Sequence, residues 1–123
     1  MARILVVEDH REVRDVLREM LEDEGYEVLE APNGKEAMRL YRTEGADLII
    51  TDILMPEKDG LEIITEVRRD FPDVKIIAIS AGGRVLESGD VLSTAKMFGA
   101  QRTFTIPFDV KEVLDAVREL LGE

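Results

Sequence analysis

Short runs of apolar residues alternate with longer amphipathic segments along the whole chain. The runs predict strands over residues 3–7, 26–30, 48–50, 74–79 and 102–105. Three of them, 3–7, 48–50 and 74–79, contain at most one polar residue and do not alternate between apolar and polar positions, which is typical of parallel strands covered on both faces. The last run is more polar than the others, which suits a strand at the edge of a sheet.

Between these runs, apolar residues recur every three or four positions, so that they fall on one face of a helix. The predicted inner faces are Val13, Val16, Leu17, Met20 and Leu21; Ala37, Leu40 and Tyr41; Leu61, Ile64 and Val67; Val91, Leu92, Ala95 and Phe98; and Val113, Ala116, Val117, Leu120 and Leu121. The chain therefore consists of five strand–helix units.

Capping and turn residues separate these units. Asn33, Asp59 and Asp109 each stand three positions before a Glu, a pattern typical of a helix N-terminus. Gly25 is a natural stop for the first helix, and Pro72 ends the third. Short connections without a linker predict a single α/β domain, a doubly wound parallel sheet with right-handed crossovers.

The composition narrows the range of partners. The net charge of −11 argues against nucleic acid or an anionic membrane as a direct partner. Cys is absent, which excludes disulfides and thiolate metal sites. The N-terminal apolar run is too short for a signal peptide, and no stretch approaches a membrane span, so a cytoplasmic location is expected.

Acidic side chains stand at the ends of two predicted strands. Glu8 and Asp9 end the first strand, and Asp52 ends the third. Because parallel strands end at one edge of the sheet, where ligands bind, these carboxylates are expected to converge. Carboxylates at short range need a proton or a cation, and oxygen ligands alone favour a hard divalent cation such as Mg²⁺.

Asp52 is then a candidate nucleophile toward phosphorus, as carboxylates are in aspartyl-phosphate enzymes. Ser80, after the fourth strand, is placed to donate a hydrogen bond to a phosphoryl oxygen, and Ala81 beside it leaves room for the group. Each residue also has a purely structural interpretation as a turn or cap residue. His10 is interpreted as a solvent-facing residue of the first helical turn rather than a metal ligand.

The segment Asp52-Ile-Leu-Met-Pro-Glu-Lys-Asp-Gly60, together with Glu8-Asp9 and Ile106-Pro-Phe108, resembles the receiver domain of two-component response regulators. The resemblance covers the whole chain. It implies a flavodoxin-like (βα)5 fold with strand order 2-1-3-4-5, and residues 1–123 as one receiver domain without an output domain. It also implies a cis peptide bond before Pro107.

The same resemblance implies a phosphoacceptor rather than an enzyme, with a histidine kinase or phosphotransfer protein as its partner. The phosphoryl group would pass to Asp52, and Mg²⁺ would be held by Glu8, Asp9, Asp52 and the backbone carbonyl of Leu54. Phosphorylation would then shift a conformational equilibrium at the surface of the fourth helix, fifth strand and fifth helix. That surface is also the expected site of a homodimer.

The chain departs from the family pattern at two positions. Ile106 stands where the family has a Lys that supplies positive charge to the phosphoryl group, and Thr103 stands where it usually has an aromatic switch residue. The segment from Ser80 to Gly99 is also longer than usual. These departures predict weakened switching more than a loss of phosphorylation.

Two alternatives remain open at this level. A pseudo-receiver would keep the fold and bind a partner without a phosphorylation cycle; Ile106 favours it, and the intact acidic cluster argues against it. A flavodoxin-like or phosphatase enzyme is less well supported, because the sequence has no Gly-rich phosphate loop and no His or Lys placed as an acid or base.

Overall fold

The computed structural model describes residues 2–53, 60–80 and 99–123. One sheet of five parallel strands lies at its centre, in the order β2-β1-β3-β4-β5. The strands are β1 (Arg3–Val7), β2 (Glu27–Ala31), β3 (Leu48–Asp52), β4 (Lys75–Ser80) and β5 (Arg102–Thr105). The predicted doubly wound, flavodoxin-like order is confirmed, and the short, polar β5 is an edge strand.

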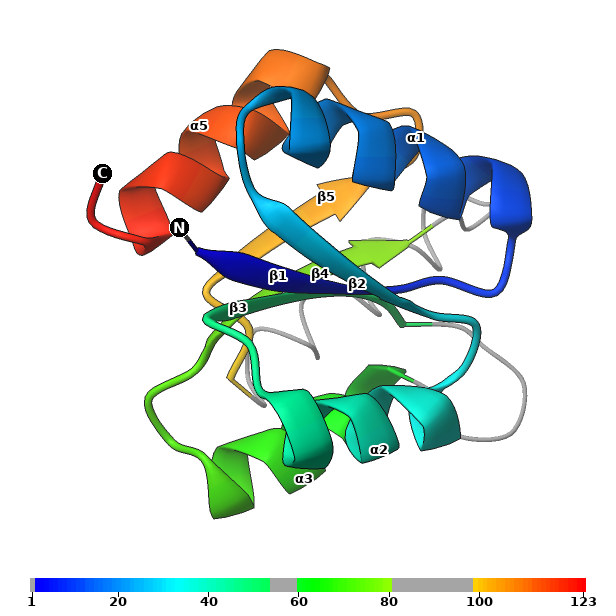
Figure 1. Cartoon of the computed structure of the whole chain (residues 1–123), viewed down its shortest axis with the longest axis vertical. Coiled ribbons are helices and arrows are strands. Elements are labelled where there is room, and N and C mark those ends of the chain that lie inside the picture. Colours follow the sequence, from blue (N-terminus) through cyan, green and yellow to red (C-terminus); the bar gives the residue numbers. More distant parts are fainter. Residues whose placement is uncertain (1, 54–59, 81–98) are drawn as a thin grey trace.

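Helices cover both faces of this sheet (Figure 1). On one face lie α1 (Arg11–Asp23) and α5 (Val110–Leu120), and on the other lie α2 (Gly34–Glu44) and α3 (Gly60–Asp70). The helix predicted around 91–98 lies outside the described residues. Within the described part of the chain, no helix is long and apolar enough to cross a membrane.

The two-sided covering explains why consecutive positions of the central strands are apolar. In β1, Ile4 and Val6 pack toward α1 and α5, while Leu5 and Val7 pack toward α2 and α3. All four side chains are fully buried. A strand that faces helices on both sides needs apolar residues at every position, because neither face meets water. The central β3 is buried along its whole length.

Two of the three predicted helix N-caps lie in the described residues, and both are confirmed. The side chain of Asn33 accepts a hydrogen bond from the backbone N–H of Glu36 at 2.9 Å. Asp109 accepts from the backbone N–H groups of Lys111 and Glu112 at the start of α5. The third predicted cap, Asp59, lies outside the described residues.

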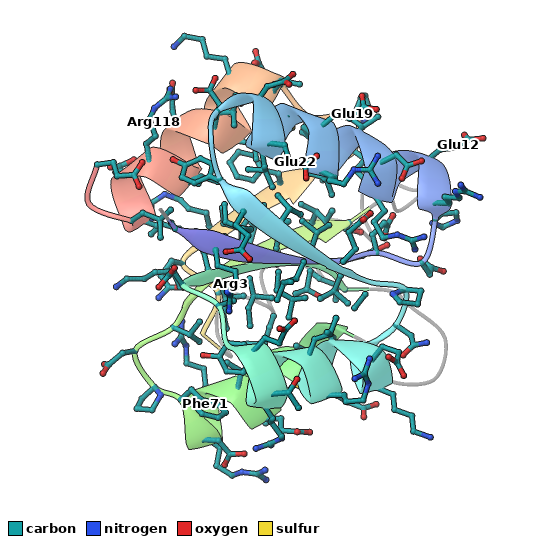
Figure 2. The ribbon with its side chains drawn as sticks, viewed as in Figure 1. Arg3, Glu12, Glu19, Glu22, Phe71 and Arg118 are labelled. Atoms are coloured by element: carbon teal, nitrogen blue, oxygen red, sulfur yellow. The ribbon has the colours of Figure 1, made fainter. Side chains whose placement is uncertain are left out.

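One position predicted to face the core is exposed. Val16 has half of its surface exposed, at 50%, although its neighbour Leu17 is fully buried. The inner face of α1 is centred on Leu17, Met20 and Leu21, and Val16 lies beyond its edge. The opposite side of α1 carries acids, and Figure 2 shows Glu12, Glu19 and Glu22 there.

Candidate functional site

The sheet register brings the acids of two strands together. Val7 of β1 pairs with Thr51 of β3, so that Glu8, which follows β1, lies beside Asp52 at the end of β3. The backbone N–H of Glu8 also donates to the carbonyl of Ala31 on the other neighbour, β2, at 3.1 Å. Glu8 is therefore fixed between two strands.

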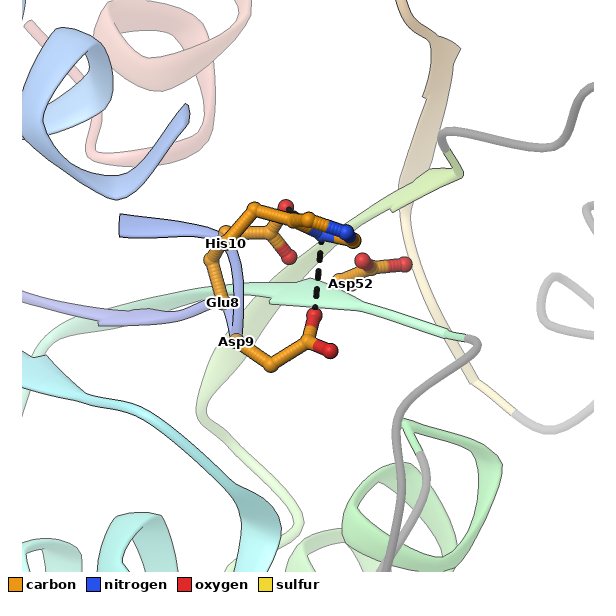
Figure 3. A group of neighbouring side chains, drawn as sticks. All are labelled: Glu8, Asp9, His10 and Asp52. Carbon is orange, nitrogen blue, oxygen red and sulfur yellow. Dashed lines mark ion pairs between the residues drawn. The ribbon is translucent and has the colours of Figure 1, made fainter. Parts of the chain in front are cut away.

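A compact group of metal-ligating atoms lies at this edge (Figure 3). Glu8, Asp9, His10 and Asp52 each offer one ligand atom, and these atoms lie within 4.8 Å of one another. Glu8 and Asp52 are buried, with exposed fractions of 0% and 1%. The predicted convergence of three carboxylates is thus seen in the geometry of the described residues.

Buried carboxylate oxygens in this pocket lack hydrogen bonds. Both side-chain oxygens of Glu8 and the Oδ1 atom of Asp9 have no hydrogen-bond partner within the described parts of the chain. Buried polar atoms are nearly always hydrogen-bonded, so acceptors this close to one another require either a proton or a positive group beside them. The donor set fits Mg²⁺, which prefers carboxylate oxygens and keeps several waters.

Burial, followed by the negative charges of the neighbouring Asp52 and Asp9 carboxylates, together raise the pKa of Glu8 from its ordinary value of 4.5 to about 9. Without a cation, Glu8 therefore holds a proton at neutral pH. A divalent cation at the pocket would replace that proton.

His10 lies closer to the acids than the sequence interpretation placed it. Its side chain is 64% exposed, which agrees with a solvent-facing position. Its Nδ1 atom nevertheless lies 3.2 Å from Asp9 Oδ1 and 3.5 Å from Glu8 Oε1. The only indication in the sequence that His10 faces these acids was its position directly after Glu8 and Asp9. That position does not reveal the direction of the imidazole ring.

Ser80 ends β4 beside Asp52 and is fully buried. Asp52 pairs with Ile79 in the register of β3 and β4, so Ser80 lies one residue beyond it at the same edge. Two further predicted site residues, Leu54 and Ala81, lie outside the described residues. Thr103 is half-buried on β5 and pairs with Ala78.

Ile106 follows β5 and is tied to the same edge. Its backbone N–H donates to the carbonyl of Ser80 at 2.9 Å, and its peptide bond to Pro107 is cis. Its side chain packs against the apolar cluster between the sheet and helices α1 and α5. Val13 and Phe108 pack there too, and together with Ile106 they line a surface groove.

Comparison with known proteins identifies the family. The model of the response regulator receiver domain matches residues 4–118. The chain is 33% identical to sporulation initiation phosphotransferase F of Bacillus subtilis, covering 97% of this chain and 93% of that protein. It is 34% identical to the chemotaxis protein CheY of Listeria monocytogenes, covering 97% and 98%. The chain therefore belongs to the response regulator receiver family.

Solved structures and longer relatives agree with this family. A receiver domain protein from Clostridium thermocellum superposes with a TM-score of 0.89 at 26% identity, over 99% of this chain and 95% of that one. The response regulator MprA of Mycolicibacterium vanbaalenii is 37% identical, and the match covers 97% of this chain but only 50% of that protein. Receiver domains thus occur both alone and as parts of longer regulators.

Proposed function

We propose that this chain accepts a phosphoryl group on Asp52 from a phosphohistidine of a kinase or phosphotransfer protein, in a reaction that requires Mg²⁺. The observation that carries the proposal is the position of Asp52 at the end of β3, against two acids with buried oxygens that have no hydrogen-bond partner among the described residues. That arrangement suits a carboxylate that must meet an anion beside a cation.

In the proposed reaction, a carboxylate oxygen of Asp52 attacks the phosphorus atom of the phosphohistidine. An O–P bond forms while the N–P bond breaks, and the histidine nitrogen regains its electron pair. Glu8, Asp9, Asp52 and the backbone carbonyl of Leu54 would hold Mg²⁺, which supplies positive charge against the repulsion between Asp52 and the incoming anion. The Ser80 hydroxyl would donate to a phosphoryl oxygen.

Two relatives support this proposal. Sporulation initiation phosphotransferase F and the chemotaxis protein CheY are matched over 93% and 98% of their own lengths, so the likeness extends over nearly the whole of each. The first of the two is named as a phosphotransferase. The transfer of that activity to this chain rests on the acidic pocket described above.

Ile106 is proposed to weaken the response that follows phosphorylation. A Lys at this position would add a cation, and a charge pair at about 4 Å is worth up to ~4 kcal/mol at an effective dielectric of about 20. Ile106 instead contributes apolar packing to the cluster under α1 and α5. The nucleophile and the metal-binding acids are retained, so phosphorylation itself is proposed to persist.

A small-molecule phosphodonor tests the assignment without a cognate kinase. We expect the wild-type chain to be labelled in the presence of Mg²⁺ and to lose labelling when the ion is chelated. Asp52→Asn should abolish labelling, because the amide is a poor nucleophile. Asp73→Asn is a matched control at an exposed loop position and should be labelled like the wild type.

Two results would contradict the proposal. Equal labelling of wild type and Asp52→Asn would place the phosphoryl group elsewhere. No labelling of the wild type, together with no Mg²⁺ binding, would favour a pseudo-receiver, which has no need for the ion.

A further inference from the structure

His10 is a polar side chain of the acidic pocket that the proposed phosphotransfer does not use. It occupies the N-cap position of α1, where Ser, Thr, Asp or Asn usually accepts a hydrogen bond from the first turn. Its ring makes no such capping hydrogen bond. Figure 3 shows the imidazole turned toward the carboxylates of Glu8, Asp9 and Asp52 instead.

The distances around His10 match those between neighbouring ligands of one metal ion. A first-row cation binds nitrogen and oxygen at about 2.1 Å, so ligands at right angles are about 3 Å apart and opposite ligands roughly 4 Å apart. Nδ1 of His10 lies 3.2 Å from Asp9 and 3.5 Å from Glu8, within the range for adjacent ligands. The whole group spans at most 4.8 Å, so a small adjustment would close it around an ion.

A second observation points to a ligand at this place. Glu8 is fully buried, and neither of its carboxylate oxygens has a hydrogen-bond partner among the described residues. Its side chain is directed into the same group of ligand atoms. A buried acid that faces a ring nitrogen and two further acids, with no hydrogen-bond partner among the described residues, is an environment that a bound cation satisfies.

The identity of the fourth ligand decides which cation is preferred. Carboxylates and water suit Mg²⁺, whereas imidazole suits Zn²⁺ and its neighbours in the first transition row. From this geometry we infer that His10 is a further metal ligand, and that its imidazole makes the pocket bind Zn²⁺ more tightly than Mg²⁺. The inference rests on the metal pocket of the proposed function. It adds a preference of that pocket for Zn²⁺ over Mg²⁺.

The consequence is a competition between two ions for one set of carboxylates. Zn²⁺ held by Glu8, Asp9 and His10 would exclude Mg²⁺ from the same oxygens. Phosphorylation of Asp52 would then depend on the relative supply of the two cations as well as on the phosphodonor.

The composition makes this inference simple to test. The chain has one His and no Cys, so only His10 can supply an imidazole or thiolate ligand. In the untagged full chain, the proton resonances of that single imidazole report directly on its coordination. We expect Zn²⁺ to shift them strongly and Mg²⁺ to leave them almost unchanged, at a pH above the ordinary imidazole pKa of about 6.5.

Calorimetric titration gives the second readout. We expect His10→Ala to lower the affinity for Zn²⁺ by about tenfold or more and to leave the affinity for Mg²⁺ nearly unchanged. Saturating Mg²⁺ should weaken the apparent Zn²⁺ affinity of the wild type, because both ions use one pocket. Glu12→Ala, at an exposed position in the first turn of α1, is the control and should alter neither affinity.

The inference fails if Zn²⁺ leaves the imidazole resonances in place. It fails equally if His10→Ala leaves the Zn²⁺ affinity unchanged, or reduces the affinities for both ions alike. These outcomes differ from a failure of the proposed function, in which Mg²⁺ does not bind the wild type and Asp52 is not labelled. His10 is largely exposed, so unfolding of the variant is not expected, and its thermal midpoint in chelator checks this.

Discussion

Glu8 is the residue whose environment differs most from that of an ordinary surface acid. It is fully buried between β1, β2 and β3, and burial together with the charges of Asp52 and Asp9 raises its pKa from 4.5 to about 9. The unfolded chain releases this proton near pH 4.5, whereas the folded, metal-free chain keeps it until about pH 9. Within that window the folded state binds more protons than the unfolded state.

This difference sets the sign of a stability prediction. Stability of the metal-free protein should fall as the pH rises from 4.5 to 9, because over this range the unfolded chain has released the Glu8 proton and the folded chain still holds it. Glu8→Gln removes the ionisation and should flatten the profile. Urea unfolding in chelator at several pH values measures it, and Glu12→Gln, at an exposed site, should keep the wild-type slope. An unaltered slope in Glu8→Gln would contradict the burial argument.

The positions of the pocket residues were partly predictable for a physical reason. Parallel strands end at a common edge, so the acids after β1 and β3 had to meet once the alternating pattern of runs and helices was recognised. The direction of the His10 ring was not predictable, because it depends on a side-chain torsion at a helix N-cap. A sequence position fixes where the backbone of such a residue lies, but not which neighbours its side chain contacts.

At the level of one helix, α1 shows how accurately an apolar pattern predicts which residues are buried. Val16 and Leu17 are adjacent and both apolar, and the pattern assigned both to the core. One residue corresponds to about 100° around a helix, so neighbours cannot share the centre of a face. Leu17 is fully buried and Val16 is half exposed, which shows that the pattern overestimated the width of the face.

The pair offers a matched test of packing within α1. Leu17→Ala should lower the free energy of unfolding by about 2–5 kcal/mol, because it removes a fully buried side chain and leaves a cavity. Val16→Ala removes a side chain that is already half in water and should cost less than about 1 kcal/mol. Urea unfolding of the two variants at one pH compares them. Equal losses would show that Val16 contributes to the core after all.

At the scale of the whole molecule, Ile106 contacts both the edge of the sheet that carries the pocket and the apolar cluster beneath α1 and α5. Its backbone N–H is bonded to Ser80 at the pocket edge, while its side chain packs into the cluster beneath α1 and α5. In the proposed function, a Lys at this position adds a positive charge that interacts with the phosphoryl group on Asp52. Ile106 keeps the backbone connection and lacks the charge.

Ile106→Lys should therefore strengthen the structural response to phosphorylation. The charge gives the phosphorylated state an interaction that the unphosphorylated state lacks, and only such a differential interaction can shift a conformational equilibrium. We expect amide spectra of the variant, with and without a phosphoryl mimic, to differ more than those of the wild type at β5 and α5. Ile106→Met is the control, because it changes side-chain shape without adding charge and should respond like the wild type. If Ile106→Lys responds no more than Ile106→Met, the missing charge is not what limits coupling between Asp52 and the edge strand.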